Sequence, residues 1–371
     1  MRIGFDAKRA FFNRSGLGNY SRQTITILSN YFSLNEYFLY TPKPQKSVSF
    51  YKAINLRIKG PQKFTHRQFS SFWRSYRLTE QLVSDKIELY HGLSNELPKE
   101  IEKTRIPSIV TIHDIIFRRY PKFYKSVDRK IYEKKFKYSV NNATRIIAVS
   151  NQTKNDIIDF FGISKDKIDV VYQGCNPVFW NPVDKVERLE ILMKYLIPEN
   201  YILYVGTIEE RKNLLNILKA LQQDKINYPL VVIGKQTSYY NKVMAYVKFH
   251  GMKNIFFLHH VPNEDLPAFY QQAKLFVYPS LFEGFGIPIL EALTSKTPVI
   301  TSCGGCFSEA GGTSSLYVDP ENVDELAHAI KKVIEDSNLR DNMIIDGFVH
   351  AQQFRLDKIA GEIMAVYQKV F

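Results

Sequence analysis

The sequence has few cysteines, no long apolar run and no export signal. Its 371 residues include three cysteines, Cys175, Cys303 and Cys306, too few for a disulfide framework. No stretch approaches the roughly 18 uninterrupted apolar residues that a membrane-spanning helix needs. The first residues, MRIGFDAKRAFF, lack the apolar segment and small-residue cleavage site of a signal peptide. These absences predict a protein of the reducing cytoplasm.

Positive charge is present in excess and is concentrated in the first half of the chain. Overall there are 50 Lys and Arg against 37 Asp and Glu, a net charge of +13. Residues 1–180 hold 31 against 15, or +16, and the remainder holds 19 against 22, or −3. A basic half can attract nucleic acid, anionic lipid or a phosphorylated ligand, or can simply keep a surface soluble. No recognised nucleic-acid-binding motif is present, so we expect no nucleic-acid partner.

Short apolar runs alternate with helical segments, which is typical of α/β domains with buried parallel strands. The ligand crevice of such a sheet lies at the carboxyl ends of its strands. A chain of 371 residues is too long for one ordinary core, so we predict two such domains. The predicted strands are Arg2–Asp6, Glu88–His91, Ser108–His113 and Arg145–Ser150, then Tyr201–Gly206, Leu230–Gly234, Ile255–Leu258, Leu275–Pro279 and Pro298–Thr301.

The best domain boundary is the turn-forming segment Gly174–Lys185, which contains two prolines. We place an N-terminal, acceptor-binding domain at residues 1–178 and a C-terminal, nucleotide-binding domain at residues 179–351. Both are expected to be Rossmann-like, doubly wound parallel sheets that face one another across a central cleft.

The segment Glu283–Glu291, EGFGIPILE, carries the strongest local signal. It follows a predicted strand, and its proline suits the first turn of a helix. Gly284 and Gly286 let the backbone approach a ligand, and amides at a helix start favour a phosphate or sugar oxygen. We expect Glu283 in the loop and Glu291 in the first turn of the helix, each gripping a different part of one ligand. The alternative is an ordinary helix start whose acidic residues complement the dipole.

A second segment, Val205–Asn213, places Arg211 and Lys212 where a predicted strand gives way to a helix. Two adjacent cations at the crevice end of a strand can bind a diphosphate and stabilise the charge of a leaving group. An ordinary basic loop is the alternative interpretation.

Two weaker features follow strands of the first half. The loop Arg14–Tyr20 contains Gly16 and Gly18, which allow a tight turn facing a phosphate or an acceptor. It is not a full dinucleotide fingerprint, which disfavours a nicotinamide enzyme. His113 can hydrogen-bond a sugar hydroxyl, although a lone histidine is more often structural, and Asp114 either fixes its tautomer or caps the next turn.

The pair Cys303 and Cys306 looks like half of a metal or redox site. No second cysteine pair exists, and the nearby histidines lack zinc-finger spacing. A loop that lines the ligand cleft is the favoured interpretation.

Together these segments resemble glycosyltransferase family 4, whose members have the GT-B fold. The resemblance covers nearly the whole chain and follows the family's order. It runs from the Gly-Leu-Gly-Asn-Tyr loop, through the His-Asp strand end and the Arg-Lys-Asn segment, to two glutamates separated by seven residues, Glu283 and Glu291. The final segment, residues 352–371, is similar to the family's C-terminal helix, which crosses back to the first domain.

The resemblance implies a role for each candidate residue. Glu283 contacts the donor sugar's hydroxyls and Glu291 the ribose, while Arg211 and Lys212 hold the diphosphate. His113 hydrogen-bonds the transferring sugar. Further donor contacts are implied for Gly16, Gly18, Thr207, Gly284, Phe285 and Gly286. Many family members have arginine at the place of Thr207, so Arg211 is expected to do most of the phosphate binding.

The implied reaction transfers a hexose, with retention, from a nucleotide-diphosphate sugar to a glycan or lipid-diphosphate-linked acceptor. No convincing Asp-x-Asp metal signature is present, so neither a metal nor a cofactor is expected. The segment Thr207–Asn213 looks like mannosyltransferases of surface-polysaccharide assembly, which favours GDP-mannose over UDP-linked sugars. The alternatives are a sugar-nucleotide epimerase or phosphorylase of the same fold, or a non-catalytic two-domain ligand-binding protein.

A dense basic and aromatic stretch within residues 118–137 suits contact with anionic lipid. We therefore expect peripheral attachment to the cytoplasmic face of a membrane. The residues concerned are Arg118, Arg119, Lys122, Lys125, Arg129, Lys130, Lys134, Lys135 and Lys137, with Tyr120, Phe123, Tyr124 and Tyr132 among them.

Overall fold

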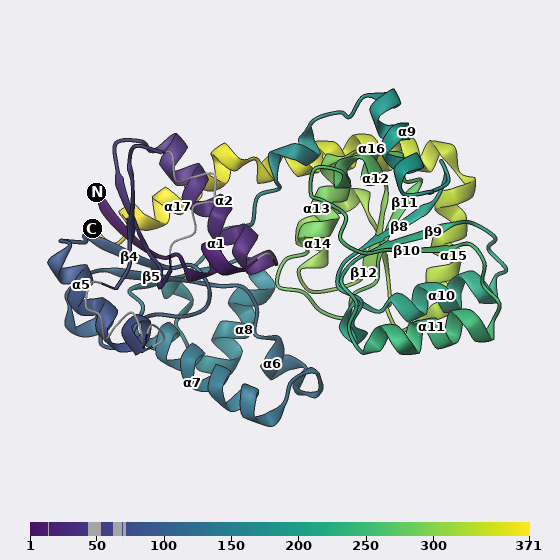
Figure 1. The fold of residues 1–371 in the computed structure, drawn as a ribbon. Coiled ribbons are helices and arrows are strands. Elements are labelled where there is room, and N and C mark those ends of the chain that lie inside the picture. Colours follow the sequence, from purple (N-terminus) through teal and green to yellow (C-terminus); the bar gives the residue numbers. More distant parts are fainter. Residues whose placement is uncertain (14, 44–52, 62–68, 70–71) are drawn as a thin grey trace. The chain divides into compact units, whose positions relative to one another are not determined.

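The chain folds into two compact units, each built on its own parallel β-sheet (Figure 1). The computed structural model describes residues 1–13, 15–43, 53–61, 69 and 72–371. The first unit comprises Met1–Gln173 and Leu356–Phe371, and the second comprises Gly174–Arg355. The prediction of two α/β domains with parallel sheets is confirmed.

The sheet of the first unit has the strand order β3-β2-β1-β4-β5-β6-β7, and all neighbouring strands are parallel. The order reverses between β1 and β4, as in doubly wound folds. The strands are β1 (Arg2–Asp6), β2 (Glu36–Tyr40), β3 (Leu56–Lys59), β4 (Leu89–Gly92), β5 (Ser108–Ile112), β6 (Arg145–Ala148) and β7 (Ile168–Val170).

Helices cover both faces of this sheet, which explains why its central strands are almost entirely buried. One face packs against α1 (Lys8–Phe12), α2 (Gly16–Tyr31) and α17 (Leu356–Gln368). The other packs against the π-helical turn η2 (Trp73–Arg77), α5 (Leu78–Ser84), α7 (Ser126–Asn142) and α8 (Asn151–Phe161). A short helix, α6 (Ile116–Arg119), follows β5.

The C-terminal helix α17 belongs to the first unit and packs against α2. A buried hydrogen bond of 2.6 Å joins the hydroxyl of Tyr367 in α17 to Nδ1 of His91 in β4. The other ring nitrogen of His91 lies 2.8 Å from the hydroxyl of Thr111. Burial lowers the pKa of His91 to about 3, so this histidine is a neutral structural link between α17 and the sheet.

The sheet of the second unit has the order β10-β9-β8-β11-β12-β13 and is also fully parallel. In chain order this is 3-2-1-4-5-6, the arrangement of Rossmann-type nucleotide-binding domains. The strands are β8 (Ile202–Val205), β9 (Leu230–Ile233), β10 (Ile255–Leu258), β11 (Leu275–Tyr278), β12 (Val299–Ser302) and β13 (Leu316–Val318).

Helices again pack on both faces of the second sheet. The apolar sides of α10 (Leu214–Gln223), α11 (Tyr239–Phe249) and α15 (Val323–Glu335) share one core with β8 and β9. The remaining helices are α9 (Lys185–Lys194), α12 (Leu266–Gln272), α13 (Ile287–Thr294), α14 (Phe307–Gly311) and α16 (Ser337–Ala351). Of these, α13 contacts β11, β12 and α16.

Four strands were not predicted from the sequence: β2, β3, β7 and β13. Three of them, β3, β7 and β13, have only three or four residues and lie at sheet edges. Their sequences, LRIK, IDV and LYV, contain no run of four apolar residues, so the sequence gives little sign of a buried strand. Hydrogen bonding to an already formed neighbour defines them.

Candidate functional site

The candidate site of the second unit lies where the strand order of its sheet reverses. Strands β8 and β11 are neighbours there, although two other strands, β9 and β10, lie between them in the chain. The loops that follow β8 and β11 carry Arg211 and Lys212 on one side and Glu283 on the other. In open parallel sheets this reversal point is the usual place of a bound ligand.

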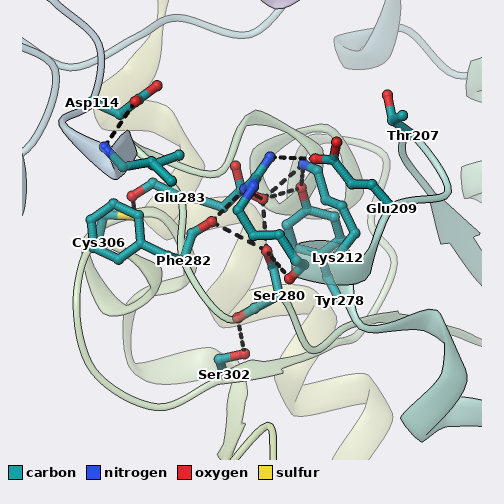
Figure 2. Close-up of polar contacts among 12 residues, drawn as sticks. Asp114, Thr207, Glu209, Lys212, Tyr278, Ser280, Phe282, Glu283, Ser302 and Cys306 are labelled. Atoms are coloured by element: carbon teal, nitrogen blue, oxygen red, sulfur yellow. Dashed lines mark hydrogen bonds and ion pairs between the residues drawn. The ribbon is translucent and has the colours of Figure 1, made fainter. Parts of the chain in front are cut away.

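Glu283 is the centre of a polar cluster in which it accepts four contacts through one oxygen (Figure 2). Its Oε1 lies 2.8 Å from Nη1 of Arg211 and 2.7 Å from Nζ of Lys212. Two hydroxyls, those of Tyr278 and Ser280, donate to the same oxygen at 2.9 and 2.8 Å. The structure therefore brings together three of the residues that the sequence predicted as site residues.

The side chain of Arg211 is fixed by a hydrogen bond to a backbone carbonyl as well as by ion pairs. Its Nη1 donates to the carbonyl oxygen of Phe282, and its Nη2 pairs with Glu209 at 2.7 Å. The backbone amide of Leu281 in turn donates to the carbonyl of Arg211 at 2.8 Å, which joins the two loops. Such a doubly anchored guanidinium presents its donors in a fixed direction.

Lys212 lies against the aromatic ring of Tyr278. Its Nζ is 4.8 Å from the ring centroid and hydrogen-bonds the Tyr278 hydroxyl. Its side chain is 12% exposed, so little solvent screens its charge. Burial lowers the pKa of Lys212, and the repulsion from Arg211 acts in the same direction, while the attraction of Glu283 opposes both.

The charges around Glu283 keep it ionised. Burial would raise the pKa of this carboxyl, but the positive charges of Arg211 and Lys212 and the hydrogen bonds outweigh burial and lower the pKa to about 2. Burial would lower the pKa of Arg211, but the charges of Glu283 and Glu209, together with the hydrogen bond to Glu283, outweigh burial and raise it. The cluster is thus a set of fixed, charged groups in a poorly solvated place, which suits the recognition of another charged group.

Glu291, the second glutamate of the signature, has a different environment. It is the fifth residue of α13, which begins at Ile287, so it lies at the start of the second turn and not in the first turn as predicted. Its Oε2 accepts a hydrogen bond of 2.9 Å from the Tyr270 hydroxyl. Burial raises the pKa of Glu291 to about 7, which the hydrogen bond from Tyr270 and the charge of Lys212 only partly offset.

The glycine segment between the two glutamates forms the turn into α13. Gly286 is the residue before the helix and has φ = 106°, a conformation that favours glycine. An added Cβ there would approach Cδ1 of Ile289 to 3.1 Å. Gly284 is half-buried in this turn, whereas the side chain of Phe285 is 2% exposed and packs against Phe354. Phe285 can therefore offer a ligand its backbone but not its ring.

Thr207 lies apart from the Glu283 cluster, beyond Glu209 (Figure 2). Its carbonyl accepts a hydrogen bond of 3.4 Å from the Tyr204 hydroxyl. Cys306 contacts the cluster from the opposite loop, because its thiol donates to the carbonyl of Glu283 at 3.3 Å. Cys303 is exposed and Cys306 is buried, and this loop after β12 supports the backbone of Glu283.

Tyr278, Ser280 and Glu209 belong to the cluster but were not predicted from the sequence. Tyr278 is the last residue of β11 and Ser280 follows it by two. Polar residues at the carboxyl end of a strand next to a glycine turn were the signal that could have identified them. Ser280 is itself held by Ser302, whose hydroxyl donates to its carbonyl at 2.6 Å.

The predicted residues of the first unit lie at the carboxyl ends of its own strands. His113 follows β5 and is 6% exposed. Its Nε2 donates to the carbonyl of Leu93 at 2.9 Å, so the Leu93 carbonyl fixes the tautomer and Nδ1 carries no proton. Asp114 caps the next turn by accepting from the amide of Ile116 at 3.2 Å. Burial lowers the pKa of His113 to about 4, so it is neutral near pH 7.

Gly16 and Gly18 lie in the first turn of α2, close in sequence to Arg14, which is outside the described residues. They differ in their surroundings. An added Cβ at Gly18 would come within 1.8 Å of the Asn13 carbonyl oxygen, whereas one at Gly16 would meet nothing within 4 Å. Gly18 is thus required for the close approach of α2 to the preceding turn, whereas Gly16 has open space beside it.

We expect Gly18→Ala to destabilise the protein and Gly16→Ala to leave its stability unchanged. Relief of the clash at Gly18 needs a backbone shift, which costs on the order of 1–3 kcal/mol. Urea unfolding of both variants measures this difference. Equal unfolding free energies for the two variants would contradict the assignment of Gly18 to structure.

Within the described part of the chain, no three His, Cys, Asp or Glu side chains gather in a way that could hold a metal ion. None of the helices found there has the length and apolar character needed to cross a bilayer.

Models of known protein families match both halves of the chain. The family model Glycosyltransferase Family 4 matches residues 34–179, and the model Glycosyl transferases group 1 matches residues 190–348. The chain belongs to glycosyltransferase family 4. It is therefore a glycosyltransferase, and its two parallel-sheet units are the two domains of the GT-B fold.

Individual relatives agree with this assignment. The chain is 29% identical to the O-antigen chain mannosyltransferase B of Escherichia coli, over 99% of this chain and the full length of that protein. Among solved structures, sucrose-phosphate synthase from Thermosynechococcus elongatus has a TM-score of 0.79 at 18% identity, covering 100% of this chain and 99% of that one. Anabaena HepE in complex with UDP-glucose has a TM-score of 0.76 at 15% identity, with 100% of both chains covered.

Proposed function

We propose that this glycosyltransferase transfers mannose from GDP-mannose, with retention of configuration, to a glycan or lipid-linked acceptor in surface-polysaccharide assembly. The observation that carries the proposal is the cluster of Arg211, Lys212 and Glu283 at the strand-order reversal of the second unit. The similarity to an O-antigen chain mannosyltransferase supports the sugar and the pathway class.

In the proposed reaction the bond between the anomeric carbon and the diphosphate oxygen breaks, and GDP leaves with the bonding electrons. The acceptor hydroxyl attacks from the same face, forms the new glycosidic bond and gives its proton to the departing phosphate oxygen. The hard step is the growth of negative charge on the leaving diphosphate. Arg211 and Lys212 are two cations fixed before the substrate arrives, and each such donor contributes about 3 kcal/mol when well placed.

Glu283 is proposed to act twice, first as the partner of Arg211 and Lys212 and then as a partner of the sugar. Before binding, its carboxylate neutralises Arg211 and Lys212 and keeps both in position. An incoming diphosphate would take over these cations and leave Glu283 to accept hydrogen bonds from the sugar hydroxyls. We propose that the two cations take the role that a divalent metal has in other transferases, so that no metal is required.

His113 is proposed to hydrogen-bond the transferring sugar. With the Leu93 carbonyl bound to its Nε2–H, the ring has an unprotonated Nδ1 that can accept from a hydroxyl. Its pKa of about 4 makes it a neutral hydrogen-bonding group and not a cation. Gly16, on the accessible first turn of α2, is proposed to allow close approach of the donor or acceptor.

Thermal unfolding with GDP and with UDP tests the donor. Binding to the folded state stabilises it by about 2.7 kcal/mol at a hundredfold excess over the dissociation constant. GDP is expected to raise Tm more than UDP at equal concentration. Transfer assays with GDP-mannose then test the reaction, because an epimerase would change the sugar without releasing nucleoside diphosphate. A larger shift with UDP would overturn the proposed base.

Nucleotide affinity should rise between pH 6 and pH 8. The ribose hydroxyls need an ionised Glu291, and a pKa of about 7 makes this carboxyl about 10% ionised at pH 6 and about 90% at pH 8. GDP affinity in the wild type is therefore expected to increase about tenfold over this range, measured by calorimetry. Glu291→Gln should bind GDP weakly and without this pH dependence. An unchanged slope in the variant would exclude Glu291 as its source.

We also propose that α7 attaches the first unit to anionic membranes. Val127 and Ile131 lie one turn apart on its outer face and are 69% and 47% exposed. Lys130 and Lys134 are exposed beside them. Two apolar side chains flanked by lysines form the pattern of an interfacial helix, and each basic residue near an anionic surface contributes about 1 kcal/mol.

Charge reversal of this face should release the protein from vesicles. The double variant Lys130→Glu/Lys134→Glu is expected to bind phosphatidylglycerol vesicles at least about thirtyfold more weakly than the wild type at low salt, measured by co-sedimentation. Reversal of Lys331 and Lys332, which are exposed on α15 of the other unit, provides the matched control. A wild type that does not sediment with anionic vesicles at low salt would remove this part of the proposal.

A further inference from the structure

The second unit contains a cavity of about 870 Å³ that is separate from the Glu283 cluster. Its wall includes Gln271 of α12 and the segment Thr294–Lys296, which lead into strands β11 and β12. It therefore lies at the amino edge of the sheet, whereas the cluster lies at the carboxyl edge. Its volume falls within the range of roughly 300–1,000 Å³ that is typical of small-molecule sites.

Aromatic rings form one part of the cavity wall. Trp180 and Phe348 meet edge to face, with ring centroids 5.9 Å apart, and both are only partly buried. The negative face of an aromatic ring packs well against the C–H groups of a sugar ring. Trp180 comes from the segment that precedes α9, and Phe348 from α16, so the tertiary fold alone brings them together.

Cationic side chains form another part. Lys185, Arg188 and Lys296 line the cavity, and Asp184 is the one acidic lining residue. Asp184 already caps α9 by accepting from the amide of Val186 at 2.8 Å. Nζ of Lys296 lies 5.0 Å from the centroid of Phe348, so a cation and an aromatic ring are presented side by side.

Arg188 contributes a guanidinium group to this wall, and its side chain is partly exposed. Its Nε is buried and has no hydrogen-bond partner among the residues that the structure describes. A guanidinium is suited to bind phosphate or carboxylate oxygens, and with the two lysines it makes this wall of the cavity positively charged.

From these observations we propose that the cavity is a second binding site, for a phosphorylated sugar. The sugar ring packs on Trp180, and the phosphate is bound by Arg188 and Lys296. The same chemistry is offered by a free sugar phosphate and by the sugar diphosphate end of a lipid-linked glycan. The site does not depend on the proposed donor site, because the two share no residue.

Calorimetry on the full chain carrying Lys212→Gln tests the site while the donor site is disabled. Mannose 1-phosphate is expected to bind this protein, with saturating GDP causing no displacement, and to bind more tightly than mannose or inorganic phosphate. A short-chain polyprenyl diphosphate sugar serves as the second probe. The probe with the higher affinity identifies the source of the ligand, and failure of both to bind overturns the proposal.

Substitutions of residues that line the cavity test which side chains contact the ligand. Lys296→Gln, at an exposed position, and Arg188→Gln are each expected to weaken binding of mannose 1-phosphate about tenfold. Trp180→Leu should weaken binding of the sugar phosphate without affecting that of inorganic phosphate. Lys331→Gln, an exposed lysine of the same unit, is the matched control. Binding that survives Lys296→Gln and Arg188→Gln unchanged, in variants with wild-type Tm, would also overturn the proposal.

Discussion

Lys212→Gln is expected to lower kcat about 10²–10³-fold, the largest effect among the proposed variants. The substitution keeps a polar side chain but removes a charge that lies 2.7 Å from Glu283 in a place with little solvent. A fixed donor aimed at a developing negative charge contributes about 3–4 kcal/mol to the transition state. Because that charge grows as the diphosphate leaves, the loss should fall on kcat more than on KM.

Steady-state transfer from GDP-mannose measures this effect, with Lys331→Gln on the exposed face of α15 as the control. The control is expected to retain wild-type kcat and KM. Circular dichroism melting separates loss of chemistry from loss of fold, since Glu283 keeps Arg211 as a partner at 2.8 Å in the variant. A Lys212→Gln enzyme that is well folded and within about threefold of wild-type kcat would show that this lysine does not stabilise the leaving group.

Glu283→Gln is expected to lower the free energy of unfolding by about 3 kcal/mol at pH 7. The native pKa of this carboxyl is about 2, against a usual value of 4.5, and a tenfold change in proton affinity corresponds to about 1.4 kcal/mol. The variant also leaves two buried cations without their shared carboxylate, which acts in the same direction. The side chain is 12% exposed, so solvent screening removes little of this effect.

The lowered pKa of Glu283 also predicts how its contribution to the unfolding free energy changes with pH. Because the native pKa is lowered, the stabilisation by Glu283 is fully present above about pH 4.5 and is lost as the pH falls toward 2. The difference in unfolding free energy between wild type and Glu283→Gln should therefore shrink between about pH 5 and pH 3. Urea titrations at several pH values measure it, with Glu335→Gln, an exposed glutamate of α15, as the control. A difference that stays constant over this range would contradict the ionised cluster.

The central part of the candidate site was predictable from local sequence. Arg211, Lys212 and Glu283 each follow a strongly apolar strand, and side chains at the carboxyl ends of neighbouring parallel strands converge. The glycines between the two glutamates likewise indicate a turn before a helix, and Gly286 has the positive φ that such a turn needs. Glu291 lies just beyond the predicted first turn because the helix begins at Ile287, one residue before the proline.

Other features depend on contacts between distant segments. Gly16 and Gly18 look alike in the sequence, but the Asn13 carbonyl lies against one and not the other. His113 looked like a ligand-binding residue at a strand end, yet the carbonyl of Leu93, from a different strand end, determines its tautomer. The cavity at Trp180 was not predicted at all, because its wall combines α9, α12, α13 and α16.

Local sequence was sufficient to establish that the chain forms two parallel-sheet domains, since apolar runs and turn residues act within a few positions of one another. It was also sufficient to indicate which loops carry the ionisable groups of the site. Tertiary packing was needed to show that one oxygen of Glu283 accepts from Arg211, Lys212, Tyr278 and Ser280 together, and that Arg188 has a buried donor without a partner among the described residues. The reason is that burial and pairing depend on the neighbours that packing supplies, and many of those neighbours lie far away in the chain.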